Sequence, residues 1–247
     1  MEIYSEFASR TDWQPGVKLQ LWLSKRFLKT YLKNTNKNAL DIDMIEVGCG
    51  NGNLALAAAE IGFKSYIGVE PNSTLVEIAT SRILLGSIVQ SKLPDLDPSL
   101  FCTADLGVVI HVIEHAPDGY EAREWIRGLA AVVRPGGNLL IVSPDVRDFR
   151  ESFWSIDWSH CFPTTVTNLS QILVDLGFEI IVAKKFRFGS VNRFANLVAW
   201  LSSFVIPSRF LDLIFRKQFK RELGTGLKVA LFWGVAFVVA QKPLETQ

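Results

Sequence analysis

The sequence is poor in histidine and cysteine and carries almost no net charge. Its 247 residues include three histidines and three cysteines, and the formal net charge is +1. Cys49, Cys102 and Cys161 have no spacing typical of a metal site, and scattered thiols in odd number fit a reducing compartment. A charge near zero gives no long-range field that attracts nucleic acid, and residues 1–180 hold no basic stripe interleaved with aromatics. We therefore expect no nucleic-acid partner.

Long apolar runs are also missing. The run 229–240 is shorter than the roughly twenty residues that a membrane-spanning helix needs. The acidic start Met-Glu-Ile-Tyr-Ser-Glu is not followed by the apolar core of a secretory signal. A hydrophobic content of 49% with 21% charged residues suits one folded domain with a full core. We expect a single cytoplasmic domain over residues 1–247.

A glycine-rich turn is the most informative pattern in the chain. An apolar run that carries Glu46 opens into Gly48, Gly50 and Gly52 before an alanine-rich segment, which predicts strand, tight turn and helix. Such a turn leaves unpaired N–H groups at a helix N-terminus, where carboxylates or phosphates bind. The third glycine comes one residue too early for the dinucleotide fingerprint, and no Gly-Lys-Ser/Thr follows for a P-loop. The pattern predicts a nucleotide-type site that fits neither of these two motifs.

A second acid ends the next apolar run. Residues 66–69 are followed by Glu70 and then by Pro71. In open α/β sheets ligands lie beyond the carboxyl ends of the strands, where an acid ending the second strand can bind both hydroxyls of a ribose. The alternative is a solvated acid that precedes a proline turn.

Strand and helix patterns alternate along the chain. We expect helices at 17–33, 53–61, 73–84 and 118–133, and strands at 43–47, 65–69, 87–90, 106–110, 138–142, 179–186 and 236–242. This order predicts an α/β fold with a doubly wound, seven-stranded, mostly parallel sheet of the Rossmann-like type.

A set of motifs in fixed order resembles a known family. The set is EVGCGNG at 46–52, GVEPN at 68–72, DLGVVIHVIEHAPD at 105–118, RPGG at 134–137 and DWSH at 157–160. In this order, over residues 40–186 and the strand resumed at 237–242, they resemble class I S-adenosylmethionine-dependent methyltransferases, in the group that acts on small molecules and saccharides.

The resemblance implies S-adenosyl-L-methionine as the cofactor and assigns its contacts. It implies that Glu46, Gly48, Gly50 and Gly52 line the methionine moiety and that Glu70 binds the ribose. The adenine would meet Gln90 and Ser91, although many family members have Asp there. Ile110 and His111 would lie beside the sulfonium.

The chain divides into three parts. We expect an N-terminal helical segment at 1–40, a catalytic core at 41–186 and 236–247, and a helical insert at 187–235, where the family usually has only a modest connection.

The segment His111-Val112-Ile113-Glu114-His115 also fits HxxEH, a pattern of some zinc peptidases. We expect it to be extended, because the run before it is β-branched and Pro117 disfavours helix at residue 116. Two histidines four residues apart on a strand lie about 13 Å apart, too far to share one ion. We therefore expect no metal, and Glu114 and His115 either brace the loop or take part in the chemistry.

Methyl transfer to a hydroxyl requires a base, and histidine is the side chain best tuned near neutral pH. The candidates are His160, His111 and His115. We favour His160, because Asp157 could orient it. Trp154 and Trp158 could form the wall of a pocket for the acceptor.

The segment between the last two expected strands bears on the acceptor. Residues 209–221 place apolar side chains on one helical face and basic ones largely elsewhere. Such a helix is either a lid over the acceptor or an element that contacts an anionic membrane surface through 190–222.

The acceptor is therefore a small molecule, a glycan or a lipid-linked molecule. A binding protein that retains the cofactor site without transfer is the alternative, and Asn53 argues against an NAD-dependent oxidoreductase.

Overall fold

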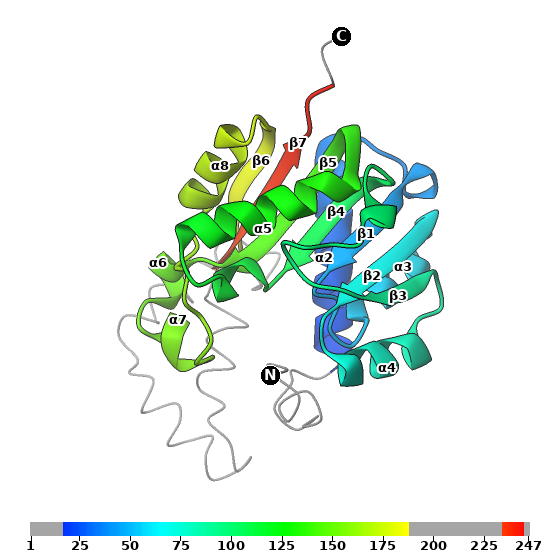
Figure 1. The fold of residues 1–247 in the computed structure, drawn as a ribbon, viewed down its shortest axis with the longest axis horizontal. Coiled ribbons are helices and arrows are strands. Elements are labelled where there is room, and N and C mark those ends of the chain that lie inside the picture. The colour runs from blue at the N-terminus through cyan, green and yellow to red at the C-terminus, as the bar shows by residue number, and fades with distance from the viewer. Residues whose placement is uncertain (1–16, 188–233, 245–247) are drawn as a thin grey trace, which may run out of the picture.

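The computed structural model describes residues 17–187 and 234–244, which form an α/β fold around one seven-stranded sheet (Figure 1). The strand order is β3-β2-β1-β4-β5-β7-β6, and β7 alone runs antiparallel to its neighbours β5 and β6. The strands are β1 Asp43–Val47, β2 Ser65–Glu70, β3 Ser87–Gln90, β4 Ala104–Ile110, β5 Val133–Pro144, β6 Glu179–Arg187 and β7 Gly234–Gln241. The predicted mostly parallel, doubly wound sheet is confirmed.

The described helices lie close to where the sequence predicts them. They are α2 Val17–Thr35, α3 Asn53–Ile61, α4 Ser73–Arg82, α5 Gly119–Val132, α6 Val146–Phe149, α7 Ser152–Ser155 and α8 Val166–Asp175, with short 3-10 turns η1 Ala39–Asp41, η2 Pro98–Leu100 and η3 Ile113–His115. Several boundaries differ from the prediction by a few residues, and two of these differences have a local cause. Helix α4 ends at Arg82, because Ile83 is already extended. Strand β5 begins at Val133, because that residue pairs with Ala104 before a register shift.

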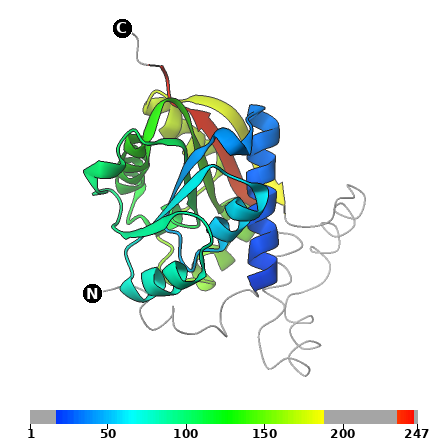
Figure 2. The same cartoon turned by 90° about the vertical axis from the view of Figure 1, so that its right-hand side faces the viewer.

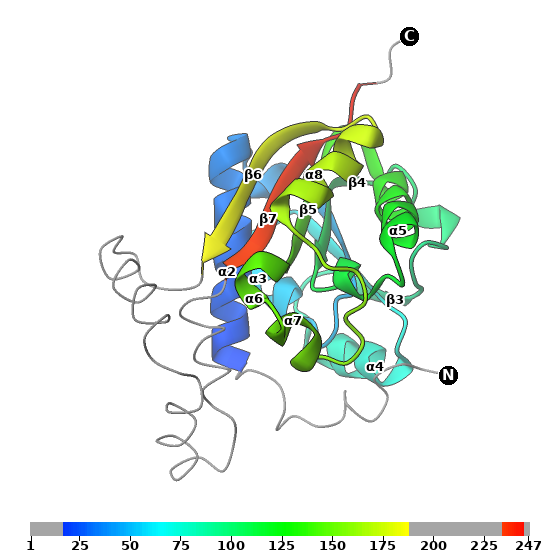
Figure 3. The same cartoon turned by 90° about the vertical axis from the view of Figure 1, so that its left-hand side faces the viewer.

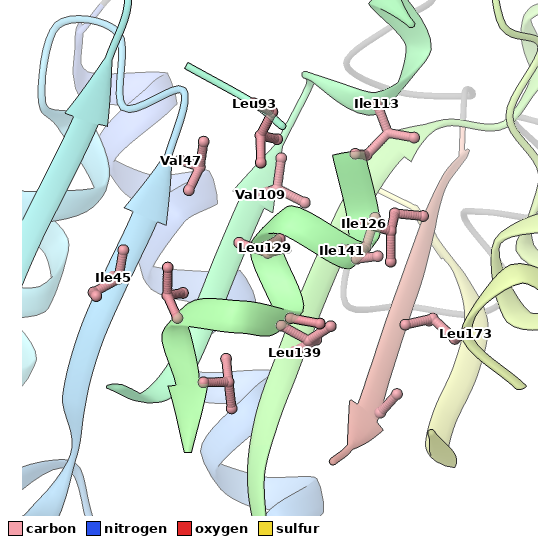
Figure 4. Close-up of a cluster of buried hydrophobic side chains, with 14 of the residues drawn as sticks. Ile45, Val47, Leu93, Val109, Ile113, Ile126, Leu129, Leu139, Ile141 and Leu173 are labelled. Atoms are coloured by element: carbon pink, nitrogen blue, oxygen red, sulfur yellow. The ribbon is translucent and has the colours of Figure 1, made fainter. Parts of the chain in front are cut away.

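Helices cover both faces of the sheet, and successive side chains of its inner strands point alternately into two buried clusters. In β5, Leu139 and Ile141 pack with α5 and α8, whereas Leu140 and Val142 pack with α2 and α3. This period of two is what a strand buried on both faces requires. Figures 2 and 3 show the two helical layers on opposite sides of the sheet, and Figure 4 shows the cluster beneath α5.

Two helix ends follow directly from local sequence. Helix α5 begins after Asp118, whose carboxylate accepts hydrogen bonds from the N–H groups of Tyr120 and Glu121. Helix α3 ends at Gly62, which has a φ of 92°. Both ends are as the sequence predicts.

The carboxyl edge of the parallel strands is where a ligand is expected. The chain builds outward from β1 to β3 and then crosses back to β4, so the strand order reverses between β1 and β4. Open α/β sheets bind ligands at this reversal, beyond the carboxyl ends of the strands. Helices α4, α6 and α7 lie at the same edge, the lower one in Figure 1.

Strand β7 starts at that edge as well. Val235 pairs with Pro144 at the end of β5, and Gly234 pairs with Arg187 at the end of β6. The expected last strand is therefore confirmed. The helical insert expected at 187–235, including the basic amphipathic pattern of 209–221, lies almost wholly outside the described residues. No helix in the described ranges combines the length and the apolar character needed to cross a bilayer.

Candidate functional site

The glycine loop joins β1 to α3 and is held close to the turn that follows β4. Gly48, Gly50 and Gly52 all have positive φ, at 77°, 54° and 80°. A Cβ on Gly48 would lie 2.3 Å from Cγ2 of Val112, so a side chain there would collide with the β4 turn. Glycine at this position is thus required both by the backbone conformation and by the close approach of Val112.

Glu46 is buried behind this loop and hydrogen-bonds to β2. The hydroxyl of Tyr66 donates to Oε2 of Glu46 over 2.5 Å. Burial raises the pKa of Glu46 to about 8; the Tyr66 hydrogen bond acts against that shift and the nearby charge of Glu70 adds to it. A Cβ on Gly68 would lie 2.9 Å from both the Tyr66 hydroxyl and Sγ of Cys49, so Gly68 makes room for this contact. Sequence reasoning missed Tyr66 and Gly68, although GVEPN marked their strand.

Glu70 ends β2 and ties two loops together. Its Oε2 accepts the N–H of Gly50 over 2.9 Å, and its Oε1 accepts the N–H of Asn72 over 3.1 Å. Burial raises the pKa of Glu70, and these two N–H donors oppose the shift. Glu70 is 6% exposed, so it belongs to the packed loop and is not a solvated residue before Pro71.

Gln90 and Ser91 lie next to Glu70, at the end of β3. Gln90 is the register partner of Glu70, is exposed, and donates from Nε2 to the carbonyl of Pro71 over 3.2 Å. Ser91 donates to the carbonyl of Asp95 over 3.3 Å. Both side chains therefore flank the acid that the resemblance assigns to the ribose.

The end of β4 turns sharply instead of continuing as a strand. Strand β4 ends at Ile110, His111 has a φ of 57°, and η3 follows at once. The expectation that 111–115 is extended is therefore wrong: the backbone leaves the sheet one residue after Ile110 and closes a 3-10 turn before Pro117. The distance argument against an ion shared by His111 and His115 fails with it.

A buried carboxylate lies at the centre of this turn. Glu114 is fully buried; its Oε1 lies 3.2 Å from Nδ1 of His111, and its Oε2 accepts the hydroxyl of Ser143 over 2.8 Å. Burial by itself would raise the pKa of Glu114, but the hydrogen bond of His111 and the charges of His111 and His115 outweigh it, so the pKa is lowered. The carboxylate is thus held in its ionised form inside the protein.

The segment after α7 packs against the same turn. The backbone N–H groups of Cys161 and Phe162 both donate to the carbonyl of Glu114, over 2.9 and 3.0 Å. His160 is 7% exposed, and its Nδ1 lies 2.6 Å from the carbonyl of Phe153. A carbonyl can only accept, so Nδ1 carries the proton and Nε2 is left as the acceptor nitrogen. Burial lowers the pKa of His160, which keeps the ring neutral at pH 7.

The carboxylate of Asp157 hydrogen-bonds to Ser159, and its backbone carbonyl accepts the N–H of His160 over 3.3 Å. Its Oδ1 accepts the N–H and the hydroxyl of Ser159, over 3.0 and 2.6 Å, and the Ser159 oxygen lies 2.9 Å from Nδ1 of His115. Asp157 therefore reaches His115 through Ser159, whereas the carbonyl of Phe153 orients His160. Trp154 and Trp158 are 49% and 82% exposed and do not form a buried wall.

Glu114, His115 and His160 come together in space. One nitrogen or oxygen of each lies within 4.8 Å of those of the other two, and the two imidazole centroids are 4.9 Å apart. The sequence did not predict this group, because its members are separated along the chain by α5 and β5. The available signal was that the segments 111–115 and 157–160 follow β4 and β5, which are neighbouring strands.

Comparisons with known proteins bear on the family and the fold of the chain. The chain matches the family model described as a methyltransferase domain over residues 19–183. A search of the curated proteins found no match. Among solved structures, a SAM-dependent methyltransferase from Archaeoglobus fulgidus is 21% identical, with 88% of this chain and 94% of that one covered and a TM-score of 0.57.

Two further solved structures share the fold. The magnesium protoporphyrin IX methyltransferase of Synechocystis PCC 6803, solved with bound SAM, is 15% identical, with 96% and 91% covered and a TM-score of 0.58. The [4+2]-cyclase SpnF is 18% identical, with 89% and 81% covered and a TM-score of 0.60. At these identities the likeness concerns the fold alone.

Proposed function

Because the chain belongs to the methyltransferase-domain family and its cofactor is S-adenosyl-L-methionine, we propose that it methylates a hydroxyl of a small-molecule, saccharide or lipid-linked acceptor. The methyl of a sulfonium is already activated. The protein therefore has to hold the acceptor in line with it, exclude water and take up the hydroxyl proton.

The donor side of the site is formed by the glycine loop and by the acid that ends β2. We assign Glu46, Gly48, Gly50 and Gly52 to the methionine moiety and Glu70 to the ribose. Both Glu70 oxygens already accept a backbone N–H, but each retains a second lone pair that can accept a ribose hydroxyl.

The neighbouring strand ends complete the donor side. We assign Gln90 and Ser91 to the adenine, because they flank Glu70 at the end of β3. Ile110 and His111 are assigned to the surroundings of the sulfonium, at the point where β4 ends.

His160 is the proposed general base. The observation that carries this is its hydrogen bond to Phe153, which fixes the proton on Nδ1 and leaves Nε2 to accept one. The lowered pKa of the buried ring keeps that nitrogen unprotonated at pH 7. Asp157 has an indirect part, since it positions His115 through Ser159.

His111 is the second candidate for the base. Its side chain is 45% exposed and its Nδ1 faces the buried carboxylate of Glu114 at 3.2 Å. A histidine oriented by a carboxylate is a common arrangement for proton abstraction. The two candidates are separated by the variants His160→Gln and His111→Gln.

The test is a transfer assay with methyl-labelled S-adenosylmethionine and a panel of monosaccharides, phenols and polyprenyl-linked glycans. We expect label in a hydroxyl-bearing acceptor, and a loss of about 10²- to 10⁴-fold in His160→Gln. Calorimetry with S-adenosylhomocysteine is the control, and its affinity should stay within about twofold in that variant. Transfer at the wild-type rate in His160→Gln would assign the base to His111 or to no histidine. Cofactor binding with no transfer to any acceptor would favour the non-catalytic alternative.

A lipid-linked acceptor would require contact with a membrane surface, which we propose for 190–222 from the sequence pattern alone. Flotation with anionic liposomes tests it. Failure of the intact protein to float with them would remove the lipid-linked class from the proposal.

A further inference from the structure

Glu114 is an ionised side chain without solvent contact, surrounded by all three histidines of the chain. It hydrogen-bonds to His111, and it lies within 4.8 Å of a ring nitrogen of His115 and of His160. Burying a carboxylate is costly unless its charge is compensated. The three imidazoles lie close enough to compensate this charge.

The contacts of the group hold it in a defined arrangement. The Ser143 hydroxyl donates to Glu114 and also lies 2.8 Å from the hydroxyl oxygen of Thr164, which donates to the carbonyl of Pro144. The backbone carbonyl of Glu114 accepts two N–H groups from the segment that carries His160. The side chain of Glu114 is thus held by Ser143, and its backbone is held by the segment that carries His160.

A shared metal ion is the competing use of Glu114, His115 and His160. Ligand atoms about 2.0–2.2 Å from one tetrahedral ion lie about 3.4 Å from each other. The ligand atoms of the three residues lie within 4.8 Å of one another, so the group is close enough to be compared with a metal site. A titration with Zn²⁺ distinguishes this use from charge stabilisation.

We propose that Glu114 is a positioning residue that stabilises the protonated form of His160 after it takes the acceptor proton. This rests on the proposed function, because it assumes that His160 is the base. When Nε2 of His160 accepts the hydroxyl proton, the ring becomes an imidazolium, and the methyl leaves the sulfonium for the acceptor oxygen. The negative charge of Glu114 offsets the positive charge of that ring.

Within the part of the chain that the structure describes, four groups near His160 influence its pKa besides burial. Burial lowers the pKa of His160 most; Glu114, the carbonyl of Phe153 and Asp157 raise it, and the charge of His115 lowers it. Glu114 comes from η3, Phe153 from α7 and Asp157 from the loop before His160 itself. Among these, Glu114 is the largest influence that favours the charged ring.

The test is NMR of the imidazole nitrogens, which is well resolved in a chain with three histidines. Signals are assigned by His111→Gln, His115→Gln and His160→Gln. We expect Glu114→Gln to lower the pKa of His160 by about one unit or more while the proton stays on Nδ1. Glu121→Gln, which removes the same charge from the exposed face of α5, should leave it unchanged.

The outcomes separate this proposal from the others. An unchanged or increased pKa of His160 in a folded Glu114→Gln protein would overturn it. If that variant does not fold, Glu114→Asp keeps the charge and should leave His160 within about 0.3 unit of the wild type, and a fall of a full unit would contradict the proposal.

Titration with Zn²⁺ forms a separate arm. Stoichiometric binding that is lost in His160→Gln would assign the group to metal binding instead. None of these measurements needs an acceptor, so failure of the transfer assay and failure of this proposal are distinguishable.

Discussion

The proposed donor and acceptor sides of the site are built in different ways. The donor side consists of backbone turns and acids at the ends of β1 and β2, and its contacts join residues of consecutive elements, as in the bond from Gly50 to Glu70. The proposed acceptor side is made of side chains from η3 and from the segment after α7, brought together across α5 and β5. The donor side can be predicted from contiguous motifs. The residues of the acceptor side come together only after the sheet has formed.

The largest effect is expected where the two sides touch. Gly48→Ala places a Cβ 2.3 Å from Val112 and demands a φ of 77°, so we expect a loss of about 2–4 kcal/mol in unfolding free energy. Affinity for S-adenosylhomocysteine should fall about 100-fold, measured by calorimetry. Adding Val112→Ala removes the collision but not the backbone strain, so only part of the stability should return. Full recovery would show that the positive φ has no cost.

The donor side alone should depend on Glu70. Glu70→Ala removes the acceptor of two backbone N–H groups and the proposed ribose ligand. The affinity for S-adenosylhomocysteine should therefore fall about 10- to 100-fold. Glu77→Ala on the exposed face of α4 should change it less than about threefold. If Glu70→Ala binds like the wild type, the ribose assignment is wrong.

Glu46 should make the unliganded protein sensitive to pH. Its pKa of about 8 lies above the unfolded value of 4.5, so between these values the folded state binds more protons than the unfolded state. Stability should therefore be highest below pH 4.5 for this group and fall as the pH rises to 8, by at most about 1.4 kcal/mol per unit.

Urea unfolding at pH 5, 6, 7 and 8 measures this dependence. Glu46→Gln should flatten it, and Glu77→Gln on the exposed face of α4 should not. The same slope in Glu46→Gln and wild type would assign the pH dependence to another group.

The smallest effect is expected from the link between Asp157 and His115. Ser159→Ala removes the bridging hydroxyl, so transfer should fall less than about tenfold with no change in cofactor affinity. NMR should show a changed environment for His115 and an unchanged Nδ1 proton on His160. A large loss of cofactor affinity would show that the donor and acceptor sides are not independent.

The sequence predicted the elements well because their signals are local. The glycines, Glu70 and the strand pattern of β1 to β4 are each encoded within a few residues. The extended reading of 111–115 was wrong because His111 adopts a positive φ, which nothing nearby in the sequence requires. The roles of Phe153 and Ser159 could not be found, since both depend on how the segment after α7 packs on η3.

The pairing of Gly234 with Arg187 has a consequence for how the protein can be remodelled. The two residues that bound 188–233 are neighbours across a β-ladder, so a short turn could connect them without disturbing either strand. They also lie beside the end of β5, at the edge that carries the site. Segments of different length could thus be exchanged at this one junction while the order of the strands stays the same.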